Sequence, residues 1–162
     1  MHANTAAVVA AADALGLRIE PVEHADGTRT AQDAADAIGC AVAQIVKSLV
    51  FGLFPAGEAE AAELVVALVA GDNQLDEAKL AAAAGAARAG RVDAERVRAA
   101  TGFPIGGVAP FGHPSPLRTF VDPDLLTHEV VWAAAGTPRS VFAIPPAELV
   151  AACNASVTPL AR

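Results

Sequence analysis

Aromatic residues and cysteines are scarce in this sequence, and each scarcity excludes a class of structure. Aromatic residues make up 4% of the 162 residues and tyrosine is absent, so valine, leucine and isoleucine must fill most of the core. The two cysteines, Cys40 and Cys153, are far apart and form no CxxC pair, which predicts neither a disulfide framework nor a metal site. Such use of cysteine is typical of the reducing cytosol, and we expect a cytoplasmic protein without a metal or cofactor.

Long apolar runs are also missing. No uninterrupted apolar stretch reaches the roughly 18 residues of a transmembrane helix, and the N-terminus lacks the basic start and apolar block of a signal peptide. Hydrophobic residues nevertheless make up 54% of the chain, which excludes disorder over most of its length. The length predicts one domain covering residues 1–162, and no segment has the composition of a linker.

Positively charged residues are few. Eleven Lys and Arg residues stand against 18 Asp and Glu residues, and the formal net charge is −7. Proteins that bind long stretches of nucleic acid are usually basic, because neutralisation of the phosphates dominates the free energy of binding. The charge therefore argues against a DNA-binding protein or a broad RNA platform. It is compatible with contact to one end of an RNA.

Helix and strand patterns are mixed along the chain. Helices are expected at residues 4–15 with Asn4 as the cap, at 30–39 with Thr30 as the cap, and at 76–84, 93–101 and 145–152. Strands are expected at residues 18–23 (an edge strand), 45–51, 64–69, 119–122, 130–135 and 141–144. Asp26 and Gly27 indicate a turn, and residues 57–63 and 136–138 indicate hairpin connections. Because strands occur both in hairpins and between helices, the pattern predicts an α/β domain with a mixed sheet.

Lys47 lies in the clearest strand pattern and is one of only two lysines. Alternation puts it on the same side of the strand as Ile45 and Phe51, and both sides are largely apolar. Because burying an unpaired ammonium is costly, we expect Lys47 to face a cavity or a partner. The alternative is an edge-strand lysine whose ammonium reaches water along its aliphatic stem.

The glycine-rich loop at residues 106–112 is the second candidate for chemistry. The adjacent Gly106 and Gly107 permit backbone conformations closed to other residues and let a ligand approach the amides closely. Inward-pointing amides can bind an anion or stabilise an oxyanion. Neither G-x-x-x-x-G-K-[ST] nor G-x-G-x-x-G is present, so neither phosphate motif applies. The alternative is a merely structural turn.

Other titratable residues show no catalytic or metal-binding pattern. The histidines His24, His113 and His128 lack ligand spacing, and no HExxH or Cys–His pattern occurs. Asp122 directly precedes Pro123, which is more typical of a helix cap than of a catalytic acid. The sequence therefore predicts chemistry that does not depend on a metal.

Several segments together carry a family resemblance. The stretch Q-I-V-K-S-L-V-F around Lys47 and the G-x-x-x-P loop from Gly106 to Pro110 are its most specific combination. Further matching segments follow in order over most of the chain, at residues 27–31, 38–40, 69–72, 75–76, 101–112, 120–122 and 132–136. In these segments the sequence resembles the YbaK/ProX-type aminoacyl-tRNA deacylases, a family related to the editing domain inserted in some prolyl-tRNA synthetases.

The resemblance implies a trans-editing hydrolase that removes a wrong amino acid from tRNA. Its partners would be the acceptor end of an aminoacyl-tRNA and a prolyl-tRNA synthetase. The implied fold is a mixed, barrel-like sheet surrounded by helices. Lys47 would be the essential lysine, with Gly106 and Gly107 as the other catalytic positions. The implied substrate-binding residues are Thr30, Val108, Ala109, Pro110, Phe111, Gly112, Asp122 and Gly136.

The amino acid removed stays open at this point. Relatives that clear alanine from proline tRNA carry a histidine in a late F-H-P-like segment, whereas this chain has V-W-A-A-A-G at residues 131–136. Alanine, serine and cysteine on proline tRNA all remain candidates, and either Lys47 or the substrate's ribose hydroxyl would assist the attacking water. Two other functions also stay open: a catalytically silent module that binds tRNA or a synthetase, and an ester hydrolase for small metabolites.

Overall fold

Helices and two β-sheets make up the part of the chain that the computed structural model describes, residues 1–24 and 30–162. The helices are α1 (Ala3–Ala14), α2 (Ala31–Ile38), α3 (Glu77–Ala84), α4 (Ala94–Thr101) and α5 (Pro146–Cys153), with the 3-10 helices η1 (Val42–Gln44) and η2 (Pro123–Thr127). The strands are β1 (Val22–Glu23), β2 (Val46–Phe54), β3 (Glu63–Ala70), β4 (Arg88–Arg91), β5 (Thr119–Val121), β6 (Val131–Ala134), β7 (Ser140–Ile144) and β8 (Ser156–Val157).

The larger sheet has five strands in the order β4-β2-β3-β5-β8, with antiparallel pairs at β4-β2-β3 and parallel pairs at β3-β5-β8. The smaller sheet is antiparallel and has the order β1-β7-β6. Among the described residues, one isolated bridge, between Ile45 and Trp132, joins the two sheets. The mixed α/β fold expected from the sequence is confirmed, although its strands form two sheets instead of one closed barrel.

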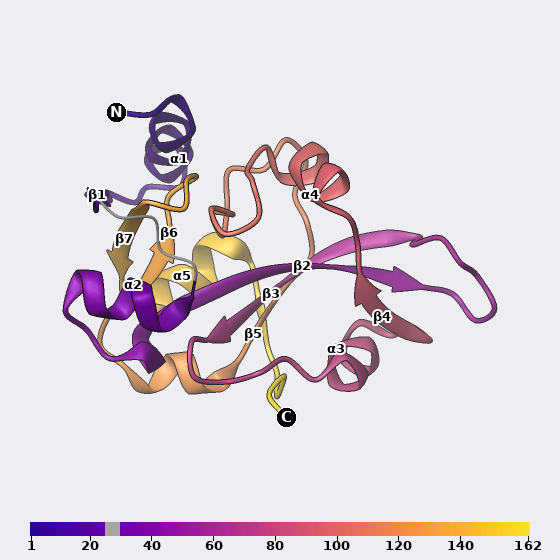
Figure 1. Cartoon of the computed structure of the whole chain (residues 1–162). Helices are drawn as coiled ribbons and strands as arrows, with labels where there is room; N and C mark the ends of the chain where they lie inside the picture. Colours follow the sequence, from indigo (N-terminus) through magenta and orange to yellow (C-terminus); the bar gives the residue numbers. More distant parts are fainter. Residues whose placement is uncertain (25–29) are drawn as a thin grey trace.

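The β2–β3 hairpin is the centre of the molecule (Figure 1). It crosses the molecule with the smaller sheet and α1 near one end and with β4 and α3 near the other. Side chains alternate across the hairpin, so each of its faces packs on a hydrophobic cluster of its own. One cluster includes Val66, Leu68 and Phe142, and the other includes Val65 and Leu80. Hydrophobic side chains therefore pack against both faces of β2 along much of the strand.

Most helix boundaries follow the capping residues seen in the sequence. The side-chain oxygens of Thr30, Asp76 and Asp93 accept hydrogen bonds from the first turns of α2, α3 and α4. The expected cap of α1 is wrong, because His2 and not Asn4 occupies that position and accepts from the Asn4 amide. An imidazole nitrogen can accept this hydrogen bond as a carboxylate oxygen would. Histidine is not among the residues preferred at helix N-caps, so the sequence did not indicate it.

Strands β4 and β8 were not expected from the sequence. Strand β4 has the sequence R-A-G-R and β8 has only two residues, so neither carries a β-branched alternating pattern. Both are edge strands whose pairing is decided by the neighbouring β2 and β5. The expected turn at Asp26 and Gly27 lies outside the described residues.

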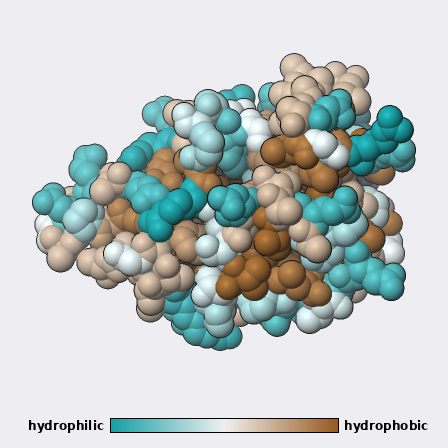
Figure 2. All heavy atoms as spheres, turned by 180° about the vertical axis from the view of Figure 1, so that it is seen from behind, coloured by the Kyte–Doolittle hydropathy of each residue, from teal (hydrophilic) through white to brown (hydrophobic). Residues whose placement is uncertain are grey.

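The surface combines hydrophobic and hydrophilic groups. Seen from behind, hydrophobic residues reach the surface in groups separated by hydrophilic ones (Figure 2). Across the described residues, no helix has the length and apolar character needed to cross a membrane.

Candidate functional site

A cavity of about 610 Å³ lies along the N-terminal half of β2. Six consecutive residues of this strand, numbers 46–51, line it. Consecutive strand residues point to opposite faces, so a cavity that contacts all six must run along the edge of the strand. Its walls also include residues of α2, α4, the loop at 105–108 and the β6–β7 turn.

Lys47 lines this cavity from one face of β2. Its side chain is partly buried, and its Nζ donates a hydrogen bond to the backbone carbonyl of Asn73. Burial lowers the pKa of the Lys47 ammonium, while the charges of Asp72 and Asp122 act in the opposite direction. Lys47 was expected to face a cavity or a partner, and in the structure it lines the cavity and has a hydrogen-bond partner, whereas its catalytic role stays a prediction.

Asp122 is 1% exposed and does not line the cavity. Its Oδ1 accepts from the Asp124 amide at 3.0 Å, as expected of the cap of η2. Its Oδ2 accepts from Asn73 Nδ2 at 2.7 Å and from the Ala70 amide at 3.3 Å. Asp122 therefore holds Asn73, whose carbonyl in turn holds Lys47. Asn73 could not be recognised from the sequence, since nothing in its spacing connects it to Lys47.

Gly106 and Val108 bring the glycine-rich loop to the cavity. Gly106 has φ +88°, a left-handed conformation that favours glycine. Gly107 lies so close to the β6–β7 turn that a Cβ there would be 2.7 Å from the backbone carbonyl carbon of Thr137. The Gly107 amide donates to the Pro104 carbonyl at 2.9 Å, so it is already used in the turn of the loop.

The remainder of the loop does not line the cavity, and its residues Ala109 to Phe111 pack into the core. Ala109 is fully buried and its carbonyl bonds the His113 ring at 2.7 Å. The Pro110 carbonyl accepts from Cys153 Sγ at 3.3 Å, and Phe111 packs on Phe142. Gly112, with φ +82°, lies against Ala11 of α1. These four residues therefore position the Gly106–Val108 segment.

The two other expected substrate-binding residues have different positions. Thr30 lines the cavity, although its Oγ1 is already the cap of α2. Gly136 does not line it, and its carbonyl accepts from Asn4 Nδ2 at 3.0 Å. A Cβ at Gly136 would lie 2.9 Å from Asn4, and the φ of +93° also favours glycine. Its neighbours Thr137 and Pro138 do line the cavity.

Ser48 is a cavity residue that the sequence analysis did not single out. Its Oγ is buried and has no hydrogen-bond partner among the described residues, which is unusual because buried hydroxyls normally find one. Alternation along β2 could have indicated it, since Ser48 interrupts the apolar face formed by Val46 and Val50.

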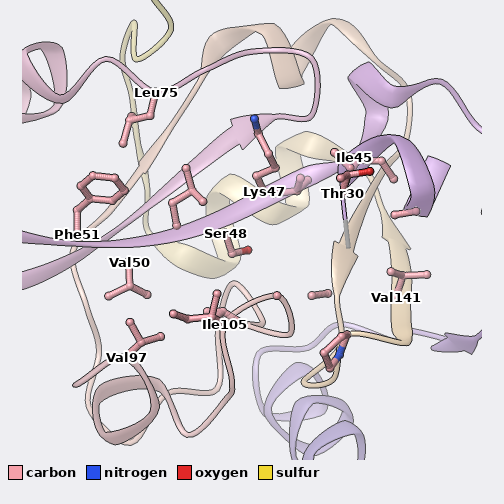
Figure 3. Close-up of a pocket in the computed structure, with 18 of the residues that line it drawn as sticks. Thr30, Ile45, Lys47, Ser48, Val50, Phe51, Leu75, Val97, Ile105 and Val141 are labelled. Carbon is pink, nitrogen blue, oxygen red and sulfur yellow. The ribbon is translucent and has the colours of Figure 1, made fainter. Parts of the chain in front are cut away.

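The structure separates the candidate residues into two groups, on either side of β2. Lys47 points to the face that carries Leu75, whereas Ser48 and Val50 point to the face that carries Ile105 (Figure 3). The ammonium and the glycine-rich loop therefore share one cavity but approach it from opposite faces of the strand. A ligand that contacts both must lie across the strand edge.

Neither cysteine is poised as a nucleophile. Burial raises the pKa of the Cys153 thiol to about 12 and also raises the pKa of Cys40. The thiolate is the reactive form, so burial disfavours the reactive form of both thiols. Within residues 1–24 and 30–162, no three His, Cys, Asp or Glu side chains form a group that could hold a metal ion.

Comparison with known proteins identifies the family. The model of the aminoacyl-tRNA editing domain matches residues 25–152. The chain is 33% identical over 127 residues to the uncharacterized protein YwhH of Bacillus subtilis (strain 168), covering 78% of this chain and 76% of YwhH.

Solved structures give the same result. One, of a protein proposed to be a trans-editing enzyme for prolyl-tRNA synthetase, superposes with a TM-score of 0.90 at 40% identity and covers 100% of this chain and 99% of that one. Another, of the protein APE2540, has a TM-score of 0.85 at 28% identity and covers 96% of this chain and 99% of that one. The chain therefore belongs to the aminoacyl-tRNA editing domain family, which includes the YbaK-type proteins.

Proposed function

We propose that this protein is a free-standing hydrolase that removes a wrong amino acid from mischarged tRNA. The observation that carries the proposal is the cavity, which is lined by Lys47, Gly106 and Val108 in a chain of the editing family. A module that only docked on tRNA or a synthetase would not require an ammonium and a glycine-rich loop in one cavity.

The reaction is the hydrolysis of the ester between the amino acid and the terminal ribose. Water adds to the ester carbonyl carbon, the bond from that carbon to the ribose oxygen breaks, and this oxygen takes up a proton. The products are a free amino acid and a tRNA with an intact 3′ end. Because an aminoacyl ester is already reactive, positioning and stabilisation of the oxyanion suffice for catalysis.

We assign a different part of the substrate to each face of β2. On one face, the Lys47 ammonium shares the cavity with Gln74 and Arg162, which suits the 3′-terminal adenosine and its phosphate. On the other face, Val50 and Ile105 form an apolar wall that suits a small side chain. The aminoacyl ester would lie between them, near Gly106 and Val108, with the amides of these two residues as the candidate donors to its carbonyl oxygen.

We further propose proline tRNA carrying alanine, serine or cysteine as the substrate, in the cytoplasm, with prolyl-tRNA synthetase as a partner. Support for the tRNA comes from the 40% identical relative, which is proposed to act with that synthetase. The apolar wall formed by Val50 and Ile105 fits small amino acids better than charged ones.

A deacylation panel across mischarged tRNAs tests the proposal, with Lys47→Ala compared against Lys79→Ala. Lys79 is a matched control, because it is the other lysine and also donates to a backbone carbonyl, that of Ala161. Removing a hydrogen bond to a charged phosphate should lower the Lys47→Ala rate by about tenfold to a hundredfold. Lys79→Ala should match the wild type. Equal rates for both variants, or no deacylation by the wild type on any tRNA, would contradict the proposal.

Substrate size separates a tRNA hydrolase from a small-ester hydrolase. A minimal aminoacyl ester has no nucleotide to contact Lys47, so Lys47→Ala should change its hydrolysis far less than that of aminoacyl-tRNA. A small-ester hydrolase would instead hydrolyse the minimal ester at least as efficiently as the tRNA.

A further inference from the structure

The edge of β2 is unpaired where it borders the cavity. On that side, β4 pairs with β2 only from Phe51 to Phe54, and the bridge to β6 involves Ile45. The parallel bridge at Ile45 uses the backbone of its flanking residues, because the N–H and C=O of Ile45 bond Val42 and Gly71. Among the described residues, no strand pairs with this edge of residues 47–50, and all four line the cavity, so the open edge faces it.

Ser48 turns its backbone hydrogen-bonding groups toward this open edge. In an antiparallel pair, alternate residues exchange hydrogen bonds with the partner strand, while those between them face the other way. The Gly71 amide donates to the Ile45 carbonyl at 2.8 Å, which establishes that Ile45, Lys47 and Leu49 turn their backbone groups toward β3. Ser48 lies between Lys47 and Leu49, so its N–H and C=O point away from β3 and into the cavity.

An exposed N–H and C=O on one residue form a specific recognition element. In a β-ladder they pair with the C=O and N–H of a single residue on the next strand. An aminoacyl ester contains this same N–Cα–C=O unit, with an α-ammonium as donor and the ester carbonyl as acceptor. Peptide recognition by strand addition uses the same bonds over several residues.

This inference rests on the proposed function. We propose that the aminoacyl group pairs with Ser48 at the edge of β2, as one residue of an additional strand would. The Ser48 carbonyl accepts from the α-ammonium, and the Ser48 N–H donates to the ester carbonyl oxygen, where negative charge develops during water attack. The unpartnered Ser48 Oγ provides a second acceptor for the ammonium. The substrate class is therefore α-amino acid esters, recognised by their backbone as well as their side chain.

The first test compares Ser48→Pro with Ser48→Ala. Proline removes the N–H at position 48, and it is tolerated on an edge strand when that N–H makes no ladder bond. Loss of one donor to the developing oxyanion should lower deacylation about 100-fold or more. Ser48→Ala keeps the backbone groups and should lose about tenfold or less. A fully active Ser48→Pro, or a Ser48→Ala as impaired as Ser48→Pro, would overturn the inference.

The second test needs no variant, so it decides the question even if Ser48→Pro fails to fold. The wild type is given alanyl-tRNA and propionyl-tRNA, which differ only in the α-amino group, and each rate is divided by the uncatalysed rate of the same ester. The acceleration should be about tenfold to a hundredfold larger for the alanyl ester, the effect of a hydrogen bond to a charged group. Equal accelerations would overturn the inference while leaving the deacylase function intact. Loss of the proposed function would instead appear as no deacylation of either ester.

Discussion

A methyl group added at Gly107 tests how the glycine-rich loop is held beside the cavity. The Cβ of Gly107→Ala would lie 2.7 and 2.8 Å from two backbone atoms of Thr137 and 3.0 Å from the Pro138 nitrogen. Backbone atoms cannot rotate away as a flexible side chain can, so either the loop or the β6–β7 turn must move. Such overpacking costs about 1–3 kcal/mol, which for a domain of this size lowers the melting temperature by about 2–12 °C.

Activity should fall more than stability alone explains. Under the proposed function, displacing the loop moves the amides of Gly106 and Val108 away from the ester, and loss of one oxyanion donor lowers rates about 100- to 1,000-fold. The control is Gly85→Ala at the end of α3, where φ is +74° and a Cβ meets nothing within 4 Å. This control should lose about 1–2 kcal/mol through left-handed strain and keep its rate.

The assay combines thermal melting and single-turnover deacylation on the same samples. If the loop is only a structural turn, both variants will melt earlier and deacylate at the wild-type rate per folded molecule. A Gly107→Ala variant with the melting temperature and the deacylation rate of the wild type would refute the close contact between Gly107 and Thr137.

Two further predictions concern buried polar groups. Asp122→Ala should lower the free energy of unfolding by about 2–4 kcal/mol, because the backbone amide of Ala70 and the side-chain amide of Asn73 lose a buried acceptor. It should also slow deacylation by releasing Asn73, while Asp122→Asn should be milder in denaturant melts and rate assays alike. Cys40→Ser and Cys153→Ser should both stay active, since burial raises the pKa of each thiol. EDTA should not inhibit either variant, and inhibition that added metal reverses would contradict this.

Local sequence signals predicted much of the fold. Thr30, Asp76 and Asp93 mark helix starts because their side chains satisfy amides of the first turn, an interaction that spans only two or three residues. The strand around Lys47 and the hairpins were also predictable, because alternation and turn residues act at short range. Strand β4 was not, since R-A-G-R forms a strand only by pairing with β2.

By itself, the sequence determined three of the helix caps, the central strands, the family and the two segments around Lys47 and Gly106 that we propose to be functional. Only the tertiary structure decided how these segments meet. Lys47 and the loop approach one cavity from opposite faces of β2, and Asn73 joins Lys47 to Asp122 across a distance in sequence that no motif spans. The open edge at Ser48 likewise depends on where β4 and β6 stop pairing with β2. Strand pairing brings distant residues together through backbone groups common to all residues, so side-chain patterns alone cannot reveal it.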